Sequence, residues 1–124
     1  MGVGRSSLPD AHAAGAEATR RALSAADPRL VIVFGALDYD PAALAQGIAA
    51  AAPGVPVFGC STSGEIAPDG PADGTVVVTA IGGPGLAVST AADEGIGGRQ
   101  REAAAVVAAC AEGYRTCPPR YSCC

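Results

Sequence analysis

Alanine and glycine dominate this sequence, and their number limits the core that the chain can build. The 124 residues include 28 alanines and 17 glycines, whereas leucine, isoleucine, valine and phenylalanine together number 24 and tryptophan is absent. Burial of apolar surface stabilises a fold by about 25 cal/mol per Å², and backbone ordering opposes it by roughly 1–2 kcal/mol per residue. We therefore expect one thin-cored domain, or part of one, in which backbones approach closely.

The charged residues exclude some classes of protein. Twelve acidic residues face eight basic ones, all arginine, and the net charge is −4. Nucleic-acid binding depends on neutralising phosphates, so this balance predicts no nucleic-acid partner. No segment approaches the ~18 consecutive apolar residues of a membrane span, and the first twenty residues lack the apolar region of a signal peptide. We expect a cytoplasmic protein without a membrane partner.

The first part of the chain predicts a single helix. Residues 1–9 predict a flexible start, with Ser7 as the capping residue of the helix that follows. Helix-forming residues then continue from Asp10 to Ala26, where Asp27 and Pro28 end the pattern.

The next thirty residues predict a strand, a helix and a second strand. Residues 30–34 form a continuous apolar run that is typical of a strand covered on both faces. Asp40 followed by Pro41 is a typical helix start, and this helix should end near Ala52. Residues 56–60 predict the second strand. A strand–helix–strand unit of this length places its two strands in parallel.

The rest of the chain predicts a hairpin, a helix and a tail. Residues 75–81 and 86–92 predict two antiparallel strands, and residues 99–112 predict a helix. Residues 113–124, with three cysteines and two prolines, predict an atypical, disordered tail. The fold class that follows is α/β, or α+β, with helices packed on a mixed sheet in an incomplete domain.

The most unusual stretch is VFGCSTSGEI, which begins at Val57. We interpret its polar part as a loop at the carboxyl end of a buried strand, where α/β sheets commonly bind ligands. Free backbone N–H groups there could hold a carboxylate, and the glutamate could pair with an amino group. The alternative is a turn whose hydroxyls satisfy their own backbone. The candidate ligand-binding residues are Gly59, Cys60, Ser61, Thr62, Ser63, Gly64 and Glu65.

This stretch resembles the GCSTAGEI-type signature of the FIST family (F-box and intracellular signal transduction). LVIVFGALDYD and TVVVTAI resemble the segments on either side of it, so the resemblance spans residues 10–112. It implies a truncated N-terminal domain of a prokaryotic sensory protein that binds small molecules such as amino acids. It also implies a small-molecule ligand and a missing C-terminal portion, or a signalling output protein, as partners.

Two other readings of the chain stay open beside the sensory one. The chain could be an inactive structural fragment of a truncated gene, or a thiol-dependent enzyme that uses Cys60. The enzyme hypothesis needs a base, and the single histidine, His12, lies on an alanine-rich helix. The spacing of the glycines also departs from the G-x-S-x-G nucleophile motif. We therefore expect no enzyme.

The sequence does not identify a cofactor. Some members of the FIST family bind haem, and here His12 or a cysteine thiolate could serve as an axial ligand. The tail cysteines Cys117, Cys123 and Cys124 lack the C-x₂-C spacing of a metal site. We therefore expect no metal.

Overall fold

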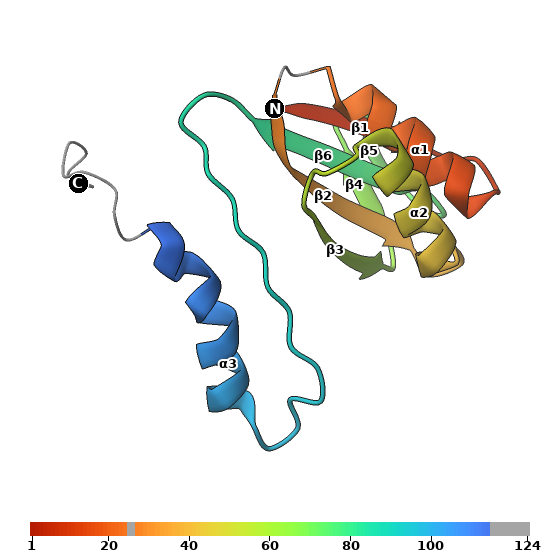
Figure 1. Ribbon diagram of the computed structural model, residues 1–124. Coiled ribbons are helices and arrows are strands. Elements are labelled where there is room, and N and C mark those ends of the chain that lie inside the picture. The colour runs from red at the N-terminus through yellow and green to blue at the C-terminus, as the bar shows by residue number, and fades with distance from the viewer. Residues whose placement is uncertain (25–26, 115–124) are drawn as a thin grey trace. The chain divides into compact units, whose positions relative to one another are not determined.

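A computed structural model describes residues 1–24 and 27–114 of the chain (Figure 1). These residues belong to two compact units, of which the first spans Met1–Val88 and the second begins at Ser89. The described residues of the first unit form two helices and six strands. They are β1 (Gly2–Ser6), α1 (Ala11–Ala22), β2 (Pro28–Ala36), α2 (Pro41–Ala51), β3 (Val57–Thr62), β4 (Glu65–Ala67), β5 (Gly70–Ala72) and β6 (Val76–Gly82).

The main sheet is mixed and has the strand order β1-β6-β2-β3. β2 and β3 are parallel, and α2 connects them, which confirms the predicted strand–helix–strand unit. β6 is antiparallel to both of its neighbours, β1 and β2. Helices α1 and α2 lie side by side on one face of the sheet (Figure 1). The predicted fold class, helices packed on a mixed sheet, is confirmed.

The core lies between the two helices and the sheet. Alternate residues of β2 and β6 point toward the helices, because successive side chains of a strand face opposite sides. Small alanines of α1 and the larger Leu44 and Ile48 of α2 cover them. The buried residues of this cluster are Ala14, Ala18, Ala22, Val31, Leu44, Ile48, Ala52, Val76, Val78 and Ala80.

Strand β1 is the main correction to the sequence analysis, which placed no element in residues 1–9. β1 pairs with β6 from Gly2 opposite Ala80 to Ser6 opposite Val76. Its glycines allow α1 to approach, since a Cβ atom at Gly4 would lie 2.1 Å from the Ala18 carbonyl oxygen. The glycines that predicted flexibility are therefore the residues that permit close packing.

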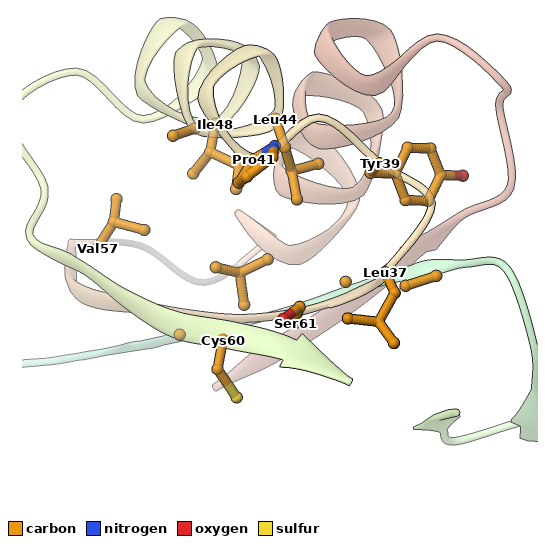
Figure 2. A pocket seen from close by; sticks show the side chains of 13 residues that line it. Leu37, Tyr39, Pro41, Leu44, Ile48, Val57, Cys60 and Ser61 are labelled. Carbon is orange, nitrogen blue, oxygen red and sulfur yellow. The ribbon is translucent and has the colours of Figure 1, made fainter. Parts of the chain in front are cut away.

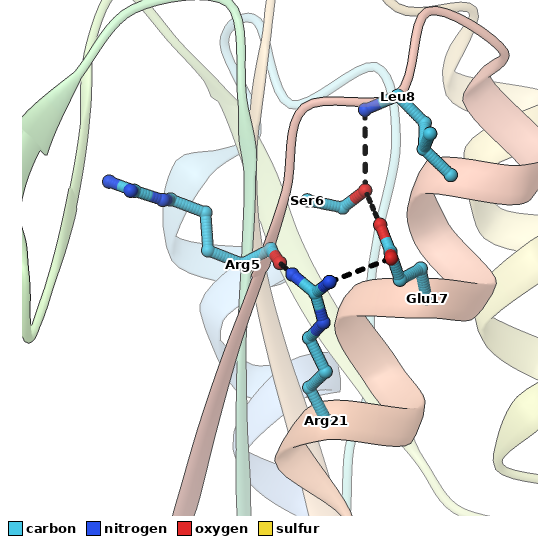
Figure 3. Close-up of polar contacts among 5 residues, drawn as sticks. All are labelled: Arg5, Ser6, Leu8, Glu17 and Arg21. Carbon is cyan, nitrogen blue, oxygen red and sulfur yellow. Dashed lines mark hydrogen bonds and ion pairs between the residues drawn. The ribbon is translucent and has the colours of Figure 1, made fainter.

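Polar side chains also link β1 to α1 (Figure 3). The buried Ser6 hydroxyl donates a hydrogen bond to one carboxylate oxygen of Glu17 and accepts one from the Leu8 N–H. Arg21 donates to the other carboxylate oxygen of Glu17 at 2.8 Å and to the Arg5 carbonyl at 2.6 Å. The helix itself begins later than predicted, because Asp10 and not Ser7 is its N-cap and accepts from the Ala13 N–H.

The β4–β5 hairpin lies against the sheet near β1, on the face opposite to the helices. Arg5 of β1 forms an ion pair with Asp69 of the hairpin turn, and Val77 of β6, which faces away from the helices, is 3% exposed. A loop is predicted for the polar part of the stretch that begins at Val57, so the strand β4 at Glu65–Ala67 is a further correction.

The predicted hairpin between residues 75–81 and 86–92 is wrong in its second half. β6 forms where the first strand was expected, but residues 83–99 contain neither helix nor strand. The reason is visible in the sheet, since β1 and β2 already occupy both sides of β6. A strand at residues 86–92 therefore has no free edge of β6 to pair with.

The described part of the second unit contains helix α3 (Gln100–Ala108), which continues as a 3₁₀ helix over Ala109–Tyr114. This helix agrees with the one predicted at residues 99–112. The Arg99 guanidinium lies 3.4 Å from the carboxylate of Asp93, which precedes the helix. It lies 3.6 Å from the carboxylate of Glu102 in the first turn of the helix. Of the predicted tail 113–124, residues 115–124 lie outside the described residues. No helix in the described ranges is long and apolar enough to cross a membrane.

Candidate functional site

A pocket of about 460 Å³ lies under α2, where it extends along β2 and β3 and reaches their carboxyl ends (Figure 2). Leu44 and Ile48 reach down from the helix, and the two parallel strands form the floor. Loops and strand ends at this edge of an α/β sheet are common ligand sites. The lining residues are Val33, Gly35, Ala36, Leu37, Tyr39, Pro41, Leu44, Ala45, Ile48, Val57, Gly59, Cys60 and Ser61.

Two glycines lie on the floor of this pocket. Gly35 and Gly59 both line it beneath α2. Both positions also restrict what could replace them. A Cβ atom at Gly35 would lie 3.0 Å from Leu44, and one at Gly59 would lie 2.0 Å from the Val33 carbonyl oxygen.

The pocket lining includes three of the predicted site residues and leaves out the other four. Gly59, Cys60 and Ser61 line the pocket, whereas Thr62, Ser63, Gly64 and Glu65 are absent from its lining. The first three do not lie in a loop, because β3 continues to Thr62. A strand directs successive N–H groups to opposite sides, so the predicted carboxylate-binding nest does not form along β3.

The thiol of Cys60 lies on the far side of β3 from α2. Figure 2 shows its side chain pointing away from the helix, while Ser61 and Val57 lie on the helix side. The pocket lining contains no histidine, carboxylate or guanidinium group. The thiol thus points away from the cavity, and the pocket lining offers no base or cation to activate it.

Glu65 has a different position from the one predicted for it. Its side chain is 2% exposed and accepts a hydrogen bond from the Thr62 hydroxyl at 2.6 Å. Its second carboxylate oxygen accepts bonds from the Thr75 N–H at 3.1 Å and the Thr75 hydroxyl at 3.0 Å. Both oxygens are thus used inside the protein, and Glu65 links the end of β3 to the start of β6 instead of facing a ligand.

Tyr39 forms one wall of the pocket, and its hydroxyl points out of it. That hydroxyl lies 2.8 Å from the Leu8 carbonyl oxygen and 3.2 Å from the Gly74 carbonyl oxygen. Its single hydrogen can be donated to one of them at a time. Burial, with a smaller contribution from the Glu65 carboxylate, raises the pKa of Tyr39 above its usual value, so the phenol stays neutral. Only its ring is available to the pocket.

The pocket is therefore apolar, with one unused polar side chain. Ser61 is exposed, and its hydroxyl has no hydrogen-bond partner among the described residues. Such a site suits an apolar group in the cavity and a hydrogen-bonding group beside Ser61. His12 is exposed on α1, and no cluster of three metal-binding side chains occurs in the part of the chain that the structure describes.

The comparisons with known proteins identify the family. The FIST N domain model matches residues 29–121, which is most of the chain and includes β2, α2, β3 and the signature stretch. The chain belongs to the FIST N domain family. The match begins later and ends later than the predicted span of 10–112. No curated protein and no solved structure matches the chain.

Membership in this family makes the chain a sensory domain of signal transduction, and a sensory family suggests a role other than catalysis. The structure adds pocket residues of this FIST N domain that the sequence analysis missed, above all Leu44, Ile48 and Val33. In the sequence, Val33 belonged only to an apolar strand, and Leu44 and Ile48 only to a predicted helix. The available signal was the position of α2, which starts at the Asp40 cap directly after β2 and therefore lies over its carboxyl end.

Proposed function

We propose that this FIST N domain senses a small metabolite that binds in the α2 pocket. The observation that carries the proposal is the coincidence of the family signature with the pocket floor, since Gly59, Cys60 and Ser61 belong to both. The cavity volume of about 460 Å³ suits a molecule of amino-acid size or somewhat larger.

The lining favours apolar amino acids and similar metabolites over charged ones. An aliphatic or aromatic side chain would contact Val33, Leu44 and Ile48, where burial of its surface contributes most of the affinity. The polar end of the ligand would lie at the rim and hydrogen-bond to Ser61. This assignment replaces Glu65 as the predicted partner of an amino group, since its oxygens are already hydrogen-bonded.

Calorimetric titration of the 124-residue chain with leucine, methionine and phenylalanine tests the proposal. Ala45→Phe should abolish binding because Ala45 lines the pocket, whereas Ala50→Phe adds the same ring at an exposed residue on the opposite side of α2 and should not. Ser61→Ala should weaken binding by about fivefold, the value of one lost hydrogen bond of ~1 kcal/mol.

Ser63→Ala is the matched control, since Ser63 is exposed nearby but does not line the pocket. The absence of binding by the unmodified chain would contradict an apolar amino-acid ligand. Equal binding by the Ala45→Phe variant would place any ligand elsewhere.

A further inference from the structure

The free edge of β3 is the starting observation. Among the described residues, β3 pairs only with β2, from Val31 opposite Val57 to Ala36 opposite Thr62. The Val31 N–H donates to the Pro56 carbonyl at 2.9 Å, so the even-numbered residues of β3 direct their backbone groups toward β2. The N–H and C=O groups of Val57, Gly59 and Ser61 therefore point away from the sheet, where no strand of the first unit receives them.

This edge lacks the devices that normally protect a sheet edge. β3 contains no charged residue, no proline and no register shift, and the exposed fractions of Val57 and Phe58 are 39% and 65%. The opposite edge differs, because β1 carries Arg5, which forms an ion pair with Asp69. Natural proteins rarely leave a long, uncharged edge strand open to solvent.

The outer surface of α2 continues this uncharged area. No charged residue occurs between Asp40 and Glu65, a stretch that includes all of α2 and β3. A solvent-facing helix normally carries charges on its outer side. Here the exposed residues of the helix are Pro41, Ala42, Ala45, Gln46, Ala49 and Ala50.

We propose that β3 forms a homodimer interface with a second copy of this chain. A two-fold axis at Gly59 would pair the two β3 strands antiparallel and join the two sheets into one. Gly59 would face Gly59 of the second copy, and Val57 would face Ser61. These pairs use the outward backbone groups identified above and form about six hydrogen bonds.

The side chains of β3 favour a second copy over an unrelated strand. In this register each larger side chain lies opposite a small one, Val57 opposite Ser61 on the helix face and Phe58 opposite Cys60 on the other face. Glycine stands at the axis, where two identical side chains would otherwise meet. The absence of charge also means that two identical surfaces meet without repulsion.

The interface adds to the pocket but does not depend on its ligand. Val57 and Ser61 line the pocket from the helix face of β3. In the dimer, Ser61 and Val57 of the second copy would lie directly beside them, at the side of the pocket that is otherwise open to solvent. If none of the ligands tested binds, the dimer proposal therefore still stands.

Sedimentation equilibrium of the full 124-residue chain tests the association. We expect a dimer for the unmodified chain and a monomer for Phe58→Lys, which places a charge in the interface. Ile66→Lys is the matched control, because Ile66 is an apolar residue of β4 with 79% exposure and lies outside the proposed interface. A monomeric unmodified chain would overturn the proposal, as would dissociation by Ile66→Lys or a dimeric Phe58→Lys variant.

Disulfide trapping tests the register without adding a charge. Phe58→Cys should form covalent dimers with Cys60 of the second copy, because facing residues of this kind have Cα atoms about 4.5 Å apart, within disulfide range. Val57→Cys should not, because its side chain lies on the other face from Cys60. Both variants carry Ser at the cysteines outside β3, which are Cys110, Cys117, Cys123 and Cys124. Equal cross-linking of the two variants, or none of Phe58→Cys, would overturn this register.

Discussion

The two edges of the main sheet are built in opposite ways. At the β1 edge, glycines bring the strand against α1, and the side chains of Ser6, Glu17 and Arg21 link the two elements. Toward the β3 edge, Gly35 and Gly59 line a cavity under α2, and no described strand of the first unit pairs with the outer side of β3. Glycine thus allows close packing against α1 at one edge of the sheet and lines a cavity near the other edge.

The decisive difference is what lies opposite each glycine. Gly2 and Gly4 face backbone carbonyls of α1, so the missing side chains are replaced by protein atoms. Gly59 likewise faces a backbone carbonyl, that of Val33. Gly35 differs, because it faces the end of the flexible Leu44 side chain and lines the pocket. The β1 edge is therefore closed by packing on α1, whereas the β3 edge is the one to which our proposals assign binding.

The largest expected effect comes from adding a side chain at a glycine of β1. Gly4→Ala should lower the free energy of unfolding by about 3 kcal/mol, because the new Cβ would lie 2.1 Å from a backbone oxygen that cannot move independently. Urea denaturation followed by circular dichroism measures it. Gly97→Ala is the control, since nothing lies within 4 Å of a Cβ there. Equal stability of the two variants would mean that β1 does not pack on α1 in this way.

A smaller loss is expected at the buried carboxylate beside β3. Glu65→Gln should lower the free energy of unfolding by about 2 kcal/mol, because the amide offers one acceptor where the carboxylate accepts bonds from both Thr62 and Thr75. Thermal and urea unfolding check this value. The control is Glu102→Gln, a side chain with 75% exposure. If Glu65→Gln is as stable as that control but loses ligand, Glu65 faces the ligand after all.

The smallest expected effect is a gain in stability on α1. The Thr19 side chain is fully buried, and its hydroxyl has no hydrogen-bond partner among the described residues. Thr19→Val keeps the shape and removes the unpaired group, so the free energy of unfolding should rise by about 1 kcal/mol. Thr62→Val makes the same chemical change where the hydroxyl is bonded, and there the sign should reverse. Unfolding curves of both variants decide whether the hydroxyl of Thr19 is truly unpaired.

Local chemistry made the middle of the chain predictable. The apolar run at residues 30–34, the cap formed by Asp40 and the run at residues 75–81 each correspond to an element of the structure. Their signals are short-range, since each depends on neighbouring residues alone. The parallel pairing of β2 and β3 followed from the helix between them, because a crossover connection through a helix joins parallel strands.

Tertiary context decided what could not be predicted. The glycines of β1 indicate flexibility by themselves, and only the nearby backbone of α1 makes them a strand. Glu65 follows a loop-like run of hydroxyls, yet Thr75, ten positions later, buries it. The expected strand at residues 86–92 was lost for the same reason, because β1, from the other end of the unit, took its place beside β6.

The central position of β6 has a consequence for how the chain folds during synthesis. β1 is made first, but its only partner strand, β6, is the last strand of the first unit to leave the ribosome. Until then, β2, α2 and β3 can assemble as a local unit, while residues 2–6 remain without a partner. Contacts between distant parts of a sequence form slowly. The insertion of β6 between β1 and β2 should therefore be the late step that completes the sheet.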